Sequence, residues 1–408
     1  MPTLRLADIV RRHGKAYREN HALPMHQHRL LRAIENCRTA VLGGHASRCS
    51  QCGETRVWYN SCRNRHCPQC QSMARAQWLE RRKGELLPVN YFHVVFTVPE
   101  QIAAIALQNK KTVYGILFRA TAETLLTIAR DPKHLGANIG YFAVLHTWGQ
   151  NLLHHPHLHC VIPGGGISPG KQSDQQATRW VASRRSFFLP VRVLSALFRR
   201  VFLAMLRTAF KNGSLQFFSS LQPLNQPNAF YRYLDPLEKL DWVVYSKKPF
   251  GGPENAIEYL GRYTHRVAIS NQRLLTDKDG KVSFLWKDYR EKNKNKKNQK
   301  VMTLAAEEFL RRFLLHSLPR GFQRIRHYGL FANPVRQQSL ALCAKLLNAP
   351  EPLPANLFHD KPAPVSFEQR YEKLTGHLLN QCPVCKTPTM VVVELFHPLI
   401  GSCFEDSS

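Results

Sequence analysis

The chain has 408 residues, with 57 lysines and arginines against 28 aspartates and glutamates, a formal charge of +29 and a pI near 10.0. This length allows two or three domains, and the composition excludes a collagen, coiled-coil or disordered chain. No run of eighteen apolar residues occurs and the first residues lack a signal-peptide core, so we expect a cytoplasmic protein with no membrane partner. The charge favours a polyanionic partner over a small-molecule substrate, because each neutralised phosphate releases condensed counterions. The alternative is a basic protein whose charge only keeps it soluble.

Hydrophobic periodicity predicts helices and strands in alternation along most of the chain. In chain order we expect helical structure over 1–42, ending at Gly43-Gly44, and helices over 73–87, 100–131, 189–210, 251–265 and 301–319. Strands are expected over 91–99, 141–150, 155–165 and 241–250, followed by a hairpin over 266–289 that turns at Asp279-Gly280. The Gly/Ser/Gln-rich stretch 164–180 predicts a loop, and the Pro-rich stretch 348–366 predicts a linker.

Cysteines near the N-terminus have the spacing of metal ligands. CSQCG supplies Cys49 and Cys52, and CPQC supplies Cys67 and Cys70, with fourteen residues between the pairs. Two CxxC turns can provide the four thiolates that structural Zn²⁺ prefers, and four thiolates leave no open position for catalysis. Inside the intervening loop, Cys62 and His66 could replace a ligand or hold a second metal. The alternative is a set of buried cysteines without metal.

A second, incomplete set lies near the other end of the chain. CPVC holds Cys382 and Cys385, and His377, His397 or Cys403 could complete a site at irregular spacing. Cysteines that are paired in sequence but bind no metal are an equally good interpretation.

Four histidines are crowded into HHPHLHCVIPGGG, residues 154–166. Because side chains alternate along a strand, His157 and His159 share one face and can chelate one metal. His155 would share that face, whereas His154 falls outside the alternation and is given no role. Gln150, at the end of the preceding strand, could add an oxygen ligand through a short antiparallel connection. Such a site acts as a Lewis acid on a phosphate.

Two other interpretations compete for the same histidines. The H-x-H-x-H spacing fits the histidine-triad nucleotide hydrolases, but this chain is several times too long and has an additional cysteine module. A histidine cluster held in the core or at the surface without chemistry is the second alternative.

Tyr259 and Tyr263 are four residues apart in the helix predicted over 251–265, so they share one helix face. Aromatic residues at this spacing are most often core residues. Beside a metal strand, however, a tyrosine hydroxyl could attack a phosphodiester. Farther along, Lys292, Lys294, Lys296, Lys297 and Lys300 form a basic loop that could follow a phosphate backbone or could simply be solvated. Nearby Trp286 and Tyr289 could stack on bases or belong to the core.

These motifs together resemble a known superfamily. His157-Leu158-His159 resembles the His-hydrophobe-His motif of the HUH endonucleases, and Tyr259 with Tyr263 resembles the YxxxY pair of their two-tyrosine members. A closer similarity is to rolling-circle insertion-sequence transposases with an N-terminal cysteine-rich zinc domain. Its blocks are CSQCG, YNSCRNRHCPQC, YFHVVFTVPE, HPHLHCVIPGGG, YLGRYTHRVAISN and LPRGFQRIRHYG, which span roughly residues 5–340.

The resemblance implies an α+β fold, with a central antiparallel sheet and flanking helices like a ferredoxin or RNA-recognition palm. A small N-terminal helical and zinc-binding domain would precede this HUH core. We therefore expect a zinc domain over 1–88, a nuclease core over 89–275, a basic loop and helical region over 276–347, and a linker with a cysteine-containing tail over 348–408.

The resemblance also implies an activity, namely nicking and rejoining of single-stranded DNA at the ends of a mobile element and in its target. Tyr259 and Tyr263 would form 5′-phosphotyrosine links in turn, and His157, His159 and Gln150 would bind Mg²⁺ or Mn²⁺. Zn²⁺ would be structural, and the protein would act at the bacterial nucleoid. The alternative from another class is a non-catalytic, zinc-containing DNA-binding protein, either a regulator or a decayed transposase.

Overall fold

The computed structural model describes residues 4–169, 178–247, 255, 261, 267–288, 299–350 and 366–399. At its centre is a five-stranded sheet in which every neighbouring pair of strands is antiparallel. The strands lie in the order β12 (Ile325–Gly329), β4 (Gly140–Trp148), β5 (His154–Pro163), β3 (Tyr91–Thr97) and β8 (Val244–Lys247). Together with its helices, this antiparallel sheet confirms the predicted α+β class.

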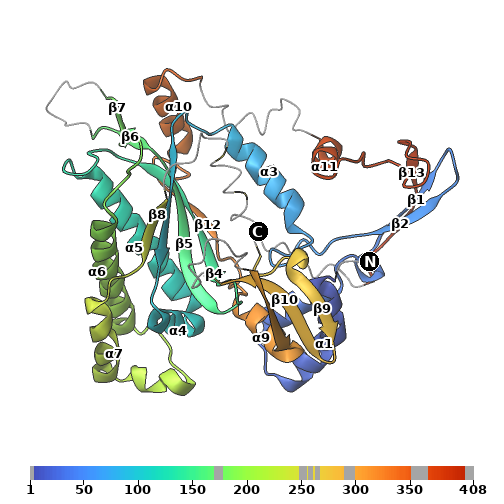
Figure 1. Cartoon of the computed structure of the whole chain (residues 1–408), viewed down its shortest axis with the longest axis horizontal. Helices are drawn as coiled ribbons and strands as arrows, with labels where there is room; N and C mark the ends of the chain where they lie inside the picture. Colours follow the sequence, from blue (N-terminus) through green and yellow to red (C-terminus); the bar gives the residue numbers. More distant parts are fainter. Residues whose placement is uncertain are drawn as a thin grey trace.

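One face of this sheet is covered by helices (Figure 1). The covering helices are α4 (Glu100–Gln108), α5 (Lys110–Arg130), α6 (Val191–Lys211) and α7 (Pro227–Lys239). Leu158, Cys160 and Ile162 of β5 point into this layer and are fully buried. Alternation along the strand therefore sends His157, His159 and Val161 to the opposite face.

The single helix expected over 100–131 is interrupted in the structure at Asn109. Its side-chain amide donates to the backbone oxygen of Gln216 at 2.8 Å, and its Oδ1 accepts from the Gln216 amide at 2.8 Å. This tertiary pairing stabilises a non-helical backbone at Asn109 (φ −122°, ψ 45°), so α4 and α5 are separate helices.

The opposite face of the central sheet is partly covered by α3 (Gln71–Lys83) (Figure 1). Trp78 of α3 lies edge-on against Phe142 of β4, with ring centroids 5.7 Å apart. Leu79 packs against the same small cluster, in which Tyr91, Phe142, Val144 and Val161 are buried. Helix α3 thus lies on the face that carries the histidines.

A second core joins the N-terminal helices to a segment near residues 268–314. Helices α1 (Leu6–Asn20), α2 (Met25–Glu35) and α9 (Ala306–Leu315) pack on a three-stranded sheet. Its strands are β9 (Leu274–Lys278), β10 (Lys281–Lys287) and β11 (Gln299–Ala305). The predicted hairpin at Asp279-Gly280 is confirmed as the β9–β10 turn, with φ of 51° and 68°. Residues 1–88 therefore share a core with residues that the sequence assigns to the separate region 276–347.

The helix expected over 301–319 is wrong at its start. Residues 299–305 form β11, because pairing with β10 (Val301 opposite Leu285, Thr303 opposite Ser283) takes up their backbone groups. The helix begins only at Ala306.

A third sheet combines the cysteine-rich segment with the tail. Strands β1 (Gly44–Cys49), β2 (Thr55–Tyr59) and β13 (Met390–Phe396) lie in the order β13-β1-β2, which we call the ribbon. Figure 1 shows the tail strand beside β1, and α11 (Phe367–Thr375) between the ribbon and α3. The tail that the sequence treats as a separate region, 348–408, is thus paired with the N-terminal region.

The remaining elements connect these parts. They are η1 (Ala40–Leu42), β6 (Gly165–Ile167), β7 (Trp180–Ala182), η2 (Ser219–Asn225), η3 (Asn271–Arg273) and α10 (Arg336–Leu346). Among the helices within the described ranges, none is long and apolar enough to cross a membrane.

Candidate active site and metal centres

Three histidines converge on the open side of the central sheet, and we call His146, His157 and His159 the histidine cluster. A ring nitrogen from each lies within 4.8 Å of those of the other two. His146 and His159 are buried, whereas His157 is half-buried at the edge of the group. Three imidazoles at this separation can hold one divalent metal ion.

His146 is the member that sequence reasoning missed. In the β4–β5 register, His146 lies directly opposite His157, and Val144 lies opposite His159. The expected third ligand, Gln150, instead lies in the turn after β4, where its backbone oxygen accepts a hydrogen bond from Arg273. His146 lies in the strand expected over 141–150, four residues before Gln150. Alternation along that strand would place both side chains on the same face, and this is the one feature of the sequence that could have pointed to His146.

Neighbouring groups orient the rings of the cluster. Nδ1 of His157 lies 2.7 Å from the backbone oxygen of His155, which can only accept, so Nδ1 carries the proton and Nε2 offers its lone pair. Nδ1 of His159 lies 2.8 Å from Nε2 of His93, a buried residue of β3. Burial, reinforced by the Lys247 ammonium, lowers the pKa of His93 to about 4, so this imidazole is neutral at pH 7. His93 is a second residue that the sequence did not single out.

The remaining two histidines of the crowded stretch lie outside the cluster. Nδ1 of His154 is 3.1 Å from the Ala103 oxygen, and its Nε2 is 2.7 Å from the Tyr114 hydroxyl. Both ring nitrogens are therefore engaged within the helix-covered layer. His155 is exposed, with its ring centroid 5.2 Å from that of His157.

The expected nucleophiles Tyr259 and Tyr263 lie outside the described residues, as does Tyr289. Gly261, between the two tyrosines in sequence, is described and is helical and buried. A Cβ on Gly261 would lie 2.8 Å from two carbons of Leu79 in α3. Because Leu79 packs on the buried cluster with Val161 and Val144, Gly261 lies over the histidine face of the sheet.

Of the five lysines expected to bind DNA, Lys292, Lys294, Lys296 and Lys297 also lie outside the described residues. Lys300 is in β11, and its ammonium lies 3.1 Å from the Asp288 carboxylate. Trp286 is partly buried and packs against the second core. This agrees with the interpretation of Trp286 as a core residue.

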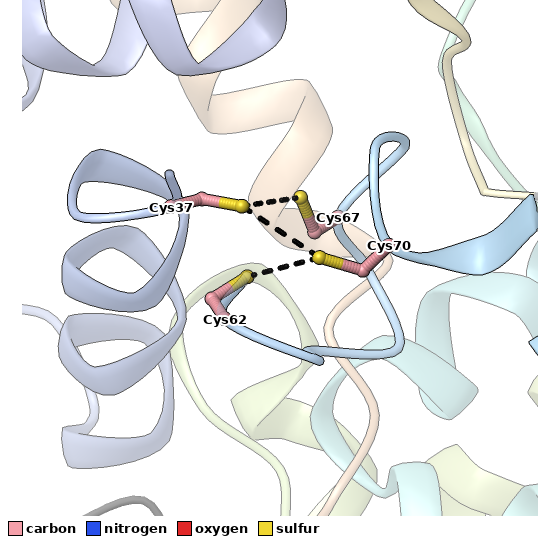
Figure 2. Close-up of side chains that lie close together, drawn as sticks. All are labelled: Cys37, Cys62, Cys67 and Cys70. Atoms are coloured by element: carbon pink, nitrogen blue, oxygen red, sulfur yellow. Dashed lines mark hydrogen bonds between the residues drawn. The ribbon is translucent and has the colours of Figure 1, made fainter. Parts of the chain in front are cut away.

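The four cysteines expected to share one zinc ion are divided between two clusters in the structure. Cys67 and Cys70 meet Cys37 and Cys62, which we call the buried cysteine cluster (Figure 2). The Cys37–Cys70 and Cys62–Cys70 sulfur pairs are 3.6 Å apart, and Cys37–Cys67 is 3.8 Å apart. Hydrogen bonding from the other three thiols lowers the pKa of Cys70. Cys37 is a lone cysteine just after α2, so its spacing offers no reason to choose it as a ligand.

Cys62 thus joins this cluster, and His66 does not belong to it. Nε2 of His66 accepts a hydrogen bond from the Leu318 amide at 3.4 Å. Burial, followed by the nearby charges of Arg65 and Arg324, lowers the pKa of His66. Its ring links the cysteine-rich loop to the segment after α9.

Cys49 and Cys52 meet Cys382 and Cys385 from the tail, and we call these four the ribbon cysteine cluster. The Cys49–Cys385 and Cys52–Cys382 sulfur pairs are each 3.6 Å apart. A zinc ion with Zn–S bonds of about 2.3 Å sets tetrahedral sulfur atoms about 3.8 Å apart, whereas a disulfide needs about 2.05 Å. Both clusters have the separation of a tetrathiolate zinc site, and their cysteines are free thiols.

Comparisons with known proteins agree with these features. Residues 9–98 match the family described as "Transposase zinc-binding domain", of IS91 type, and residues 140–339 match the family described as "Putative transposase". The first match includes the buried cysteine cluster, and the second includes the histidine cluster.

Two curated relatives are similar over most of the chain. "Putative transposase y4qJ" of Sinorhizobium fredii is 59% identical over 405 residues, which cover 98% of each chain. "Transposase for insertion sequence element IS801" of Pseudomonas savastanoi pv. phaseolicola is 26% identical over 337 residues, covering 81% of this chain and 76% of that protein. No solved structure matches. The chain therefore belongs to the family of transposases with an IS91-type zinc-binding domain.

Proposed function

We propose that this transposase nicks and rejoins single-stranded DNA at the ends of its element by rolling-circle transposition, through 5′-phosphotyrosine links. The observation that carries this proposal is the convergence of His146, His157 and His159 on one sheet face, with Gly261 packed over that face through Leu79. This arrangement is what an HUH-type palm requires, because the metal ligands and the tyrosine segment must lie on the same side of the sheet. The palm assignment is part of the proposal.

The residues of the histidine cluster fit a divalent metal. Each can offer one ring nitrogen, and contacts to His155 and His93 fix the ring orientations of His157 and His159. A donor set of three imidazoles suits Mn²⁺ better than Mg²⁺, which prefers oxygen ligands. When bound, the metal would act as a Lewis acid on a phosphate oxygen.

The chain's own residues then account for strand cleavage. The hydroxyl oxygen of Tyr259 or Tyr263 attacks the scissile phosphorus and loses its proton, and a new phosphorus–oxygen bond forms. The bond from phosphorus to the 3′ oxygen breaks, and that oxygen leaves as a 3′-hydroxyl after taking up a proton. Because one phosphodiester bond replaces another, a free 3′-hydroxyl can reverse the step on a different strand without ATP. Two tyrosines allow two such links.

The cysteine-rich region would fold and orient the N-terminal part of the protein on DNA. In the buried cysteine cluster, Cys37, Cys62, Cys67 and Cys70 would hold one structural Zn²⁺, in place of the set Cys49, Cys52, Cys67 and Cys70 expected from spacing. The charge of +29 and the lysines near 292–300 would bind the phosphate backbone of the element ends and of the target.

An adduct assay tests the proposal. Full-length protein is incubated with a labelled single-stranded oligonucleotide from the element end and Mn²⁺, and then analysed in SDS. We expect a covalent complex that disappears in the Tyr259→Phe, Tyr263→Phe double variant. The control is Tyr231→Phe in α7, on the helix-covered side, which should form the complex at the wild-type level.

Binding of cognate ends without any covalent complex from the wild type would overturn the proposal and favour the non-catalytic DNA-binding alternative. Release of a free mononucleotide that does not depend on either tyrosine would instead indicate a nucleotide hydrolase.

A further inference from the structure

The ribbon cysteine cluster joins two CxxC segments that are 330 residues or more apart in the sequence. Cys49 and Cys52 lie within the region that matches the zinc-binding family, whereas Cys382 and Cys385 lie far beyond both matched regions. The zinc-binding family match therefore covers only two of these four thiols, and neither match covers the two from the tail.

The two CxxC segments have the same backbone geometry. In each, the amide of the first cysteine donates to the oxygen of the fifth residue after it: Cys49 to Glu54 and Cys382 to Thr387, both at 2.8 Å. In each, the fourth residue after that cysteine donates back to its oxygen at 3.0 Å, and has a positive φ: 74° at Gly53 and 64° at Lys386. Two identical turns that face each other present two thiols apiece to a common centre.

Hydroxyl and amide groups around the ribbon cysteine cluster lie close enough to its sulfur atoms to donate hydrogen bonds to thiolates. The Thr389 hydroxyl lies 3.0 Å from Cys49 Sγ, and the Thr387 hydroxyl lies 2.9 Å from Cys385 Sγ. The Cys52 amide donates to Cys49 Sγ at 3.4 Å. Donors that converge on sulfur favour the deprotonated form, which is the form that binds metal.

The ribbon has little else to hold it together. All five residues of β2 are exposed, as are five of the seven residues of β13. No residue of β1, β2 or β13 belongs to any hydrophobic cluster found among the described residues. Small folds without a core of their own usually depend on a metal or on disulfides, and in such cases metal binding and folding are coupled.

We infer that Cys49, Cys52, Cys382 and Cys385 form a second structural Zn²⁺ site, which holds the C-terminal tail on the N-terminal ribbon. The site is independent of the proposed nuclease chemistry. It also fixes α11, which precedes the CPVC segment and contacts α3 through an Arg370–Glu80 ion pair of 2.9 Å. Glu80 is adjacent to Leu79, on which Gly261 packs, so the tail supports α3 at the point where α3 contacts Gly261.

Cobalt substitution of the full-length protein tests this inference, because sulfur-to-Co²⁺ charge-transfer absorbance reports thiolate ligands and not the histidine cluster. We expect two tetrathiolate sites per chain in the wild type. The Cys382→Ser, Cys385→Ser double variant should lose half of the charge-transfer absorbance. Cys343→Ala, at a buried cysteine outside both clusters, should keep all of it.

Limited proteolysis gives a second readout. The double variant should be cleaved within residues 366–399 several-fold faster than the wild type, whereas Cys343→Ala, outside both cysteine clusters, should leave cleavage of the tail unchanged. One tetrathiolate site per wild-type chain would overturn the inference, whatever the variants do. A double variant that keeps the full absorbance would overturn it as well.

Discussion

The same strands supply both faces of the central sheet, but the two faces place different demands on their side chains. One face requires apolar packing, and the other requires particular ring nitrogens at particular positions. On β5, Leu158 points into the helix-covered layer and is fully buried, while its neighbour His159 points to the histidine cluster. The covered face consists mainly of apolar side chains packed under α5 and α6. The other face has an apolar half under α3 and a histidine half.

This difference separates stability from chemistry within one strand. The covered face can change among apolar residues of similar volume at low cost, because only packing constrains it. The histidine half depends on particular atoms at particular places. Substitutions at adjacent positions should therefore affect different measurements.

The largest effect is expected at His157. His157→Ala should reduce the yield of the covalent DNA complex by more than the roughly 10–100-fold that loss of an outer-shell partner costs a metal site. Because His157 is only half-buried, the free energy of unfolding should change by less than about 1 kcal/mol. Adduct formation with Mn²⁺ and urea unfolding measure the two quantities. Undiminished adduct formation would remove His157 from the site.

Leu158→Ala should have the opposite profile. The loss of a fully buried leucine should lower the free energy of unfolding by about 2–5 kcal/mol, through lost transfer energy and a residual cavity. At a temperature where the variant is folded, its Mn²⁺ affinity should match that of the wild type. A large loss of affinity without loss of stability would show that the two faces are not separable.

Acid should destabilise the protein through histidines on the covered side. Burial lowers the pKa of His154 and of His316 to about 3, while an unfolded histidine has a pKa near 6.5. As the pH falls below 6.5, the unfolded state binds protons that the folded state does not bind, so stability is lost between about pH 6.5 and 3. Each histidine contributes up to about 1.4 kcal/mol per pH unit.

Urea unfolding at pH 7.5 and 5.5 measures this dependence, and His154→Gln is the control. The variant should lose less stability between the two pH values than the wild type loses. An identical loss in both proteins would show that His154 titrates normally.

A smaller effect on the metal site than that of His157→Ala is expected at His93, which contacts the metal site only through His159. His93→Ala should weaken Mn²⁺ binding by about 10–100-fold, because the His159 ring loses the partner that orients it. His93→Gln retains a group that can hydrogen-bond, and should recover part of the affinity by calorimetry. If Gln and Ala weaken binding equally, His93 acts through packing and not through its ring nitrogen.

Much of the central sheet was predictable from the sequence. Tyr91–Thr97 and Gly140–Trp148 are rich in β-branched and aromatic residues, and the Asp279-Gly280 turn has the two residues that tolerate positive φ most readily. Alternation also placed His157 and His159 on one face. These features depend on the conformational preferences of neighbouring residues, so they can be predicted from the sequence alone.

The third histidine was not predictable in the same way. His146 and Gln150 are four residues apart, so a continuous strand would present both on the same face. What separates them is the end of β4 at Trp148 and the turn that follows, where Leu152 has a φ of 61°. Register depends on such turn geometry and on tertiary contacts, including the His316 ring 3.0 Å from the Leu152 oxygen.

Which cysteines share a cluster could not be predicted from the sequence, for a related reason. Sequence proximity suggested that Cys49 and Cys52 pair with Cys67 and Cys70. Doubling the length of a loop raises its closure cost by only about 0.6 kcal/mol, so a partner 330 residues away costs only about 3 kcal/mol more than one some fifteen residues away. The pairing of β13 with β1 brings Cys382 and Cys385 to Cys49 and Cys52, and no local sequence pattern predicts this pairing.

That pairing has a consequence for synthesis of the protein. Cys49 and Cys385 are 336 residues apart, and at about 5–20 residues per second roughly 17–70 s separate their translation. During this interval β1 leaves the ribosome with one edge unpaired, because β13 does not yet exist. The ribbon is therefore among the last parts of the molecule to be completed, and a chain that terminates early never acquires it.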